Sequence, residues 1–208
     1  MPKPTSPAIR PPSAIDALIV EAEACTVCAA TLPLGPRPVV RASATARLLI
    51  VGQAPGTKVH ETGIPWNDPS GDRLREWLGI DRATFYDACR IAILPIGFCY
   101  PGRLPHGGDA PPRPECAPLW QAPFSTAMPA LRLTLLVGSY AQAYYLGKGG
   151  LEARVRDFRA FLPGRFPLPH PSWRTRAWAA RRPWFETEVL PALREAVAGV
   201  LDMKGTES

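Results

Sequence analysis

The sequence Leu48-Leu49-Ile50-Val51, followed at once by Gly52-Gln53-Ala54-Pro55-Gly56, decides the fold class of this 208-residue chain. Four consecutive apolar residues predict a short strand that is buried on both faces, as in a parallel sheet covered by helices. The glycines and proline that follow predict a tight turn at the carboxyl end of that strand. In open α/β sheets, ligands bind beyond this end of the strands.

Three later segments repeat the pattern of a short apolar run followed by a turn. The predicted strands are 91–94, 133–137 and 166–168, and the turns after them are 95–97, 138–139 and 170–172. Helices are expected at 14–24, with Ser13 as the cap, at 71–78, after Ser139, at 151–161, and at 185–201 with a bend at Pro191. Strands that alternate with helices predict a three-layer α/β/α sandwich with a central, mainly parallel four-stranded sheet.

Length and composition predict one globular domain over residues 14–202, between a proline-rich flexible tail (1–13) and a short flexible tail (203–208). Hydrophobic residues make up 46% of the chain, which is enough for a core. No apolar run approaches the roughly 20 residues that span a bilayer, and the first residues lack the apolar core of a signal peptide. We therefore expect a cytoplasmic monomer without membrane contact.

The charge distribution favours an anionic partner. The net charge is +6, and residues 154–182 contain eight arginines and a single acid, interleaved with phenylalanine and tryptophan. Arginine binds phosphate through paired hydrogen bonds, and aromatic rings stack on bases, so this stretch favours nucleic acid. A solvated basic helix face over core aromatics is the alternative that composition leaves open.

The cysteines form two separated pairs, Cys25 with Cys28 and Cys99 with Cys116. In a reducing cytosol, spaced cysteines more often bind metal than form disulfides. Four thiolates suit either zinc or an iron–sulfur cluster, and unrelated buried cysteines are the remaining alternative. The second pair lies in a proline- and glycine-rich stretch, 99–118, that is expected to lack regular structure. Cys89 is expected to be a small core residue.

Five motifs in order resemble the uracil-DNA glycosylase superfamily, and most of all its iron–sulfur branches, families four and five. They are the Gly52–Gly56 loop, Gly63-Ile64-Pro65-Trp66, Ser70-Gly71, the cysteine pair 99 and 116, and His170-Pro171-Ser172. The resemblance extends from about Cys25 to the last helix. It implies a DNA glycosylase that excises uracil or a related deaminated base from DNA. It also implies a structural 4Fe–4S cluster on the four cysteines, with zinc less favoured.

The same resemblance assigns catalytic roles. His170 would donate a hydrogen bond to the departing base, and Trp66 would stack on it. Gln53 stands where family four has a glutamate; it can orient water but cannot accept its proton. Asp68, by similarity to family five, would then activate water and stabilise the sugar cation, with Asp72 as a substitute. The alternatives are a capping role for Asp68, a core role for Trp66 and a turn role for His170.

Further residues are expected to bind the base or the DNA backbone. The base-binding residues would be Gln53, Ala54, Trp66, Asn67 and His170. The DNA-binding residues would be Pro55, Gly56, Ser139, Ser172, Trp173, Arg174 and Arg176, with Trp173 entering the gap left by the flipped base. Residues 94–98 contain no amide side chain, so hypoxanthine or xanthine could also be accepted. The alternative function is a non-catalytic iron–sulfur or zinc protein that binds nucleic acid; a hydrolase using Ser139 or Ser172 lacks a recognisable partner base.

Overall fold

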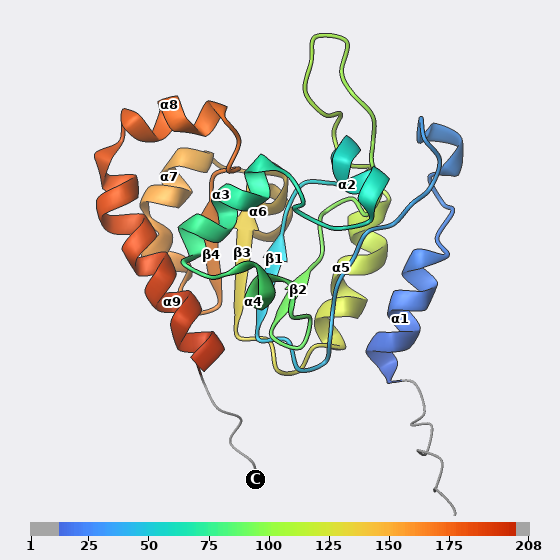
Figure 1. Cartoon of the computed structure of the whole chain (residues 1–208), viewed down its shortest axis with the longest axis horizontal. Coiled ribbons are helices and arrows are strands. Elements are labelled where there is room, and N and C mark those ends of the chain that lie inside the picture. Colours follow the sequence, from blue (N-terminus) through green and yellow to red (C-terminus); the bar gives the residue numbers. More distant parts are fainter. Residues whose placement is uncertain (1–12, 203–208) are drawn as a thin grey trace, which may run out of the picture.

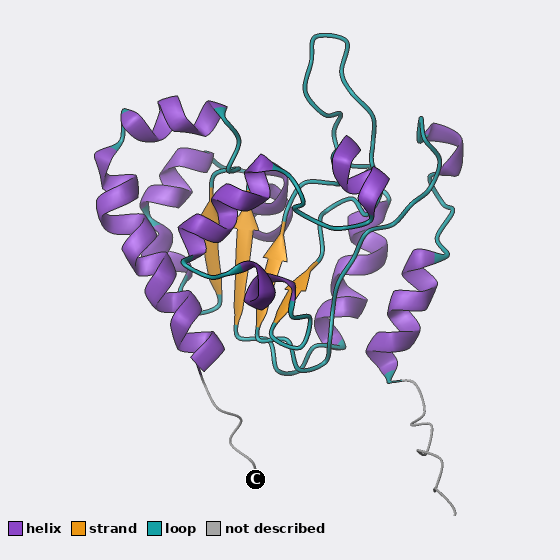
Figure 2. Cartoon of the chain, in the orientation of Figure 1, coloured by secondary structure: helices purple, strands orange, loops and turns teal. Residues whose placement is uncertain are grey.

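A computed structural model of the chain describes residues 13–202. Its centre is one sheet of four parallel strands in the order β2-β1-β3-β4 (Figure 2). The strands are β1 (Leu48–Val51), β2 (Ile91–Ile93), β3 (Leu133–Val137) and β4 (Arg165–Leu168). In the register of the ladder, Leu48 lies opposite both Ile91 and Leu133. The predicted strands and their parallel arrangement are confirmed.

Helices cover both faces of the sheet and make the predicted three layers (Figure 1). Successive strand residues enter two separate cores: Leu48 and Ile50 pack on one side, and Leu49 and Val51 on the other. This alternation, with all four side chains buried, explains why the run is uniformly apolar. The first core includes α3 (Pro69–Leu78), α7 (Leu151–Arg156) and α9 (Leu190–Asp202). The second includes α1 (Ala14–Glu23), α5 (Cys116–Thr126) and α6 (Ser139–Leu146).

Helix ends follow local capping chemistry where the sequence supplies it. Ser13 caps α1 and forms a capping box with Asp16, as its position predicts. Helix α3 begins two residues earlier than expected, because Asp68 caps it. The expected final helix starts as a π-helical segment, Phe185–Val189, before α9, in place of a bend at Pro191 alone.

Several short elements were not predicted. They are α2 (Thr57–Thr62), α4 (Arg82–Tyr86) and α8 (Arg174–Ala180), and a 3₁₀ turn, Ala29–Thr31. The predicted helix 151–161 divides into α7 and a 3₁₀ turn, Phe158–Phe161, and the stretch expected to be irregular to residue 118 ends where α5 begins. The core role expected for Cys89 is wrong, because this residue is exposed. Helices α2, α4 and α8, of five to seven residues each, were missed because so few turns give no periodic apolar pattern.

Two expectations concern parts of the chain outside the fold. The predicted tails lie, apart from Ser13, outside the described residues. Within residues 13–202, no helix combines the length and apolar character that crossing a membrane requires.

Candidate active site

A cleft of about 490 Å³ lies at the carboxyl ends of the strands. The chain turns to opposite sides after β1 and β3, so this is the topological switch point of the sheet, where α/β folds bind ligands. The predicted site residues that line the cleft are Gln53, Ala54, Pro55, Gly56, Trp66, Asp68, His170, Ser172 and Arg174. The tertiary structure thus brings together loops that follow β1 and β4.

Trp66 and His170 meet in this cleft. Their rings stack with centroids 5.6 Å apart and planes inclined by 30°. Only 9% of the surface of Trp66 is exposed, and the residue also packs in the core below β1. Trp66 therefore belongs to the core and lines the cleft at the same time, so its position allows both roles that the sequence left open.

Two glycines make room for Trp66. A Cβ at Gly52 would lie 2.9 Å from Cζ2 of the Trp66 ring, and a Cβ at Gly71 would lie 1.8 Å from its carbonyl oxygen. Trp66 itself has a φ of 55°, a left-handed conformation that a bulky residue adopts only where its surroundings enforce it. The conformation of this tryptophan is therefore set by contacts on several sides.

His170 is held by the turn that follows β4. Its carbonyl oxygen accepts hydrogen bonds from Oγ1 of Thr175 (2.5 Å) and from the backbone N–H of Ser172 (2.8 Å). Burial lowers the pKa of the imidazole, whereas the carboxylates of Asp68 and Asp109 oppose this shift. His170 is accordingly neutral at pH 7, and a neutral imidazole still carries one N–H that can donate.

Asp68 lines the cleft and caps a helix at the same time. Its Oδ1 accepts a hydrogen bond from the backbone N–H of Gly71 at 2.8 Å, at the start of α3. The capping role is thus confirmed, and the catalytic role stays a prediction. Its substitute, Asp72, pairs with Arg75 and does not line the cleft.

Gln53 is bonded to a segment for which no catalytic role was predicted. Its Nε2 donates a hydrogen bond to the carbonyl oxygen of Ala110 at 3.2 Å. Ala110 belongs to the loop between β2 and α5, which extends from the rim of the sheet beside α2 (Figure 1). We call residues 102–110 the rim hairpin, because Arg103 and Asp109 pair across it as an antiparallel bridge. Asp109 lines the cleft.

Comparison with known families agrees with this geometry. A family model described as the uracil DNA glycosylase superfamily matches residues 40–194. The chain belongs to this superfamily. At that level it is a hydrolase of the glycosidase type, in a family that acts on DNA in repair. The matched range contains every cleft-lining residue except Val39, but neither Cys25 nor Cys28, so the match does not show the iron–sulfur branch.

Four predicted site residues do not line the cleft of this superfamily member. They are Asn67, Ser139, Trp173 and Arg176. Oδ1 of Asn67 accepts a hydrogen bond from Arg82 at 3.2 Å, so this amide is engaged elsewhere. Trp173 is 73% exposed, and the guanidinium of Arg174 lies over its ring.

Asp109 was not predicted from the sequence. Partial burial raises its pKa above the ordinary value, Arg103 and His170 oppose the rise, and Asp68 adds to it. The one local signal was an acid within the glycine-rich sequence His106-Gly107-Gly108-Asp109 of a long loop. Such loops in compact domains often carry function, but the sequence alone does not show where the carboxylate lies.

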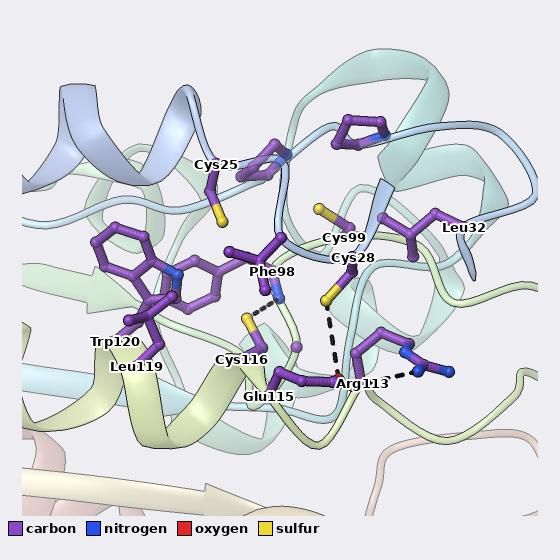
Figure 3. A pocket seen from close by; sticks show the side chains of 14 residues that line it. Cys25, Cys28, Leu32, Phe98, Cys99, Arg113, Glu115, Cys116, Leu119 and Trp120 are labelled. Atoms are coloured by element: carbon purple, nitrogen blue, oxygen red, sulfur yellow. Dashed lines mark hydrogen bonds and ion pairs between the residues drawn. The ribbon is translucent and has the colours of Figure 1, made fainter. Parts of the chain in front are cut away.

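Cys25, Cys28, Cys99 and Cys116 line a second pocket (Figure 3), which shares no lining residue with the cleft. It lies between the segment after α1, the loop at Phe98-Cys99 and the start of α5. Sγ of Cys116 accepts a hydrogen bond from the backbone N–H of Phe98 at 3.3 Å. Cys28 lies 3.9 Å from a carboxylate oxygen of Glu115, to which its thiol can donate. The cysteines therefore share one location.

Burial in this pocket favours the protonated form of three of the four thiols. Burial raises the pKa of Cys28, Cys99 and Cys116, that of Cys116 to about 12, and neighbouring cysteines add to each rise. A metal would have to displace these protons, since thiolates are the ligands. The donor set fits a soft metal site. Across residues 13–202, however, no three His, Cys, Asp or Glu side chains stand in a group that could hold a metal ion.

Proposed function

We propose that the protein is a DNA glycosylase that extrudes uracil or a related deaminated base and hydrolyses its N-glycosidic bond. The observation that carries the proposal is the Trp66–His170 pair inside a cleft at the switch point of a uracil DNA glycosylase fold. A base must leave the stack to reach such a cleft, and an aromatic ring is a suitable surface for it.

His170 would stabilise the departing base. When the glycosidic bond breaks, its electron pair goes to the base, and negative charge develops on the base carbonyl oxygens. A positioned N–H donor at such an oxygen typically contributes 10²- to 10³-fold to a rate. The lowered pKa of His170 favours the neutral imidazole, and its remaining N–H would donate the hydrogen bond to the base.

The rim of the cleft would hold the DNA backbone. Ser172 and Arg174 line it, and Nη1 of Arg73 donates a hydrogen bond to the carbonyl oxygen of Ser172 at 2.8 Å, which fixes the loop. Arg174, with Arg176 on the exposed side of α8, would give an affinity that falls as salt rises.

We propose a broad base preference. Besides Gln53, the predicted base-binding residues include one amide, Asn67. Its oxygen accepts a hydrogen bond from Arg82, and it lies outside the cleft lining. Recognition would then depend on backbone groups and on the free oxygen of Gln53. Residues 94–98 themselves contain no side-chain amide that could read uracil, which supports hypoxanthine and xanthine as further substrates.

We also propose a structural 4Fe–4S cluster on Cys25, Cys28, Cys99 and Cys116, with zinc as the alternative. The convergence of four thiols on one apolar pocket supports it. When bound, the metal would link the segment after α1 to the start of α5 and would take no part in bond cleavage. Iron, sulfide and zinc analysis of the purified protein, with its absorbance near 400 nm, distinguishes the two.

The test is base release from oligonucleotides that carry uracil, hypoxanthine or xanthine, followed by alkaline cleavage at the abasic site. We expect the wild type to release at least one of these bases and His170→Ala to be about 100-fold slower or worse. His106→Ala is the matched control, because His106 is exposed and does not line the cleft. If the wild type binds these strands but releases no base, the protein is a non-catalytic binder.

A further inference from the structure

We propose, on the basis of the glycosylase function above, that Asp109 on the rim hairpin is the carboxylate that activates the attacking water and stabilises the sugar cation. Gln53, at the position of the family-four glutamate, would instead be a positioning residue that holds this hairpin. The catalytic carboxylate would thus come from the loop between β2 and α5. It would come neither from the loop after β1 nor from the start of α3.

The position of Asp109 supports this role. Its carboxylate lies against the loop that follows β1, since a Cβ at Gly56 would be 3.7 Å from Oδ2 of Asp109. Asp109 and His170 line the same cleft and interact electrostatically, and Asp68 interacts with both. The imidazole therefore shares its cleft with two carboxylates, one from the start of α3 and one from the rim hairpin.

The two carboxylates differ in what they are bonded to. Oδ1 of Asp68 accepts the hydrogen bond from the N–H of Gly71, so one of its two oxygens is engaged in capping α3. The side chain of Asp109, by contrast, has neither a hydrogen bond nor an ion pair to any residue in the range 13–202. Both oxygens of Asp109, which is exposed on its hairpin, are thus open to a water molecule in the cleft, and desolvation raises the pKa of this carboxyl.

The backbone of the rim hairpin is fixed although its tip is exposed. The N–H of Ala110 donates to the carbonyl oxygen of Gly102 at 2.8 Å, and the N–H of Leu104 donates to that of Gly108 at 2.9 Å. Gln53 then joins the hairpin to the loop after β1 through Ala110. The residue next to Asp109 is thus bonded both to the hairpin and to the sheet rim, so the carboxylate is held over the cleft.

The reaction step balances with water as the single co-reactant. The bond between C1′ of the sugar and the base nitrogen breaks, and its electron pair stays on the base. The oxygen of a water molecule forms a new bond to C1′, and the proton that this water loses passes to the carboxylate of Asp109. The base anion takes a proton from solvent, and Asp109 later returns its own, which leaves a free base and an abasic sugar.

Two isosteric variants separate the carboxylates. Asp109→Asn removes the charge without changing the shape, and Asp68→Asn keeps a good helix cap, because Asn caps about as well as Asp. Asp157→Asn is the control for loss of one negative charge, since this aspartate is exposed and outside the cleft lining. Each is assayed for single-turnover base release and for binding to a strand with 2′-fluorinated deoxyuridine, whose glycosidic bond resists hydrolysis.

We expect Asp109→Asn to slow base release by about 100-fold or more while the affinity stays within about threefold, as for loss of a general base. Asp68→Asn and Asp157→Asn should stay within about tenfold of the wild type. Gln53→Ala should slow base release by less than Asp109→Asn, and Gln53→Glu, which cannot donate to Ala110, should not rescue it.

Two results would overturn the inference. If Asp109→Asn is as active as Asp157→Asn, Asp109 is not the catalytic carboxylate, and a large loss in Asp68→Asn would assign the role to Asp68. In both cases an active wild type leaves the proposed glycosylase function intact. A wild type that releases no base from any strand of the panel overturns the function and this inference together.

Discussion

The active-site cleft and the cysteine pocket are both assembled from distant segments, but they are held in different ways. The cleft lies at the carboxyl edge of the sheet, where residues in or after β1, β2 and β4 line it, and the strands of this sheet are almost wholly buried and paired in register. The cysteine pocket lies among loops and helix ends. There the carbonyl oxygen of Phe98 accepts a hydrogen bond from the backbone N–H of Val39 at 2.8 Å. The sheet can fix its site without a ligand, whereas the loops supply donors that a metal would draw together.

The largest effect should come from changing the support of the cleft. Gly71→Ala would place a Cβ 1.8 Å from the carbonyl oxygen of Trp66, so the backbone must move, and we expect a loss of about 3 kcal/mol in the free energy of unfolding. Gly199→Ala is the matched control in a helix with open space around it, and it should gain about 0.5–1 kcal/mol. Denaturant unfolding measures both. Equal stability of the two variants would show that the cleft is not rigidly supported.

The cysteine pocket should respond next, and in a different property. If a metal links its segments, Cys25→Ser should lose the bound metal and about 2 kcal/mol of stability, which lowers Tm by roughly 4–8 °C for a chain of this size. Base release by the folded fraction should change little, because this pocket is separate from the cleft. Cys89→Ser, at an exposed cysteine outside the pocket, should match the wild type. Metal content unchanged in Cys25→Ser would count against the site.

A smaller effect is expected at the outer edge of the cleft. Trp173 is exposed beside Arg174, and a ring that fills the gap in a duplex gains roughly the stacking energy of one base, about 1 kcal/mol or more. Trp173→Ala should therefore slow release from duplex DNA about fivefold, while release from a single strand, which has no gap to fill, stays the same. Equal rates for wild type and variant on duplex would remove the wedge role.

The smallest effect is a titration within the cleft. Burial lowers the pKa of His170 below 6.5, so its neutral form contributes stability that is present above pH 6.5 and is lost as the pH falls through the lowered value. The carboxylates of Asp68 and Asp109 both raise this pKa. Asp68→Asn and Asp109→Asn should each lower it further, which NMR titration of the imidazole measures. A pKa that rises in either variant would contradict the arrangement.

The sequence was sufficient wherever the signal was local. A run such as Leu48–Val51 must lie between two apolar layers, and a parallel sheet sends the loops after its strands to one edge. The expectation that Trp66 and His170 meet follows from this rule together with the family motifs, and the stack of the two rings confirms it. Cys25, Cys28, Cys99 and Cys116 line one pocket, whereas the metal site expected on them stays a prediction.

The tertiary structure alone decided which polar groups are free to act. Asp68 and Asn67 are engaged by Gly71 and Arg82, and Gln53 by the rim hairpin, whereas Asp109 faces the cleft unbonded within the described part of the chain. Periodicity and spacing report burial and turns, which depend on neighbours in sequence. Hydrogen bonding and the pKa of a buried group depend on neighbours in space. Which residues become such neighbours is decided by how loops of tens of residues fold.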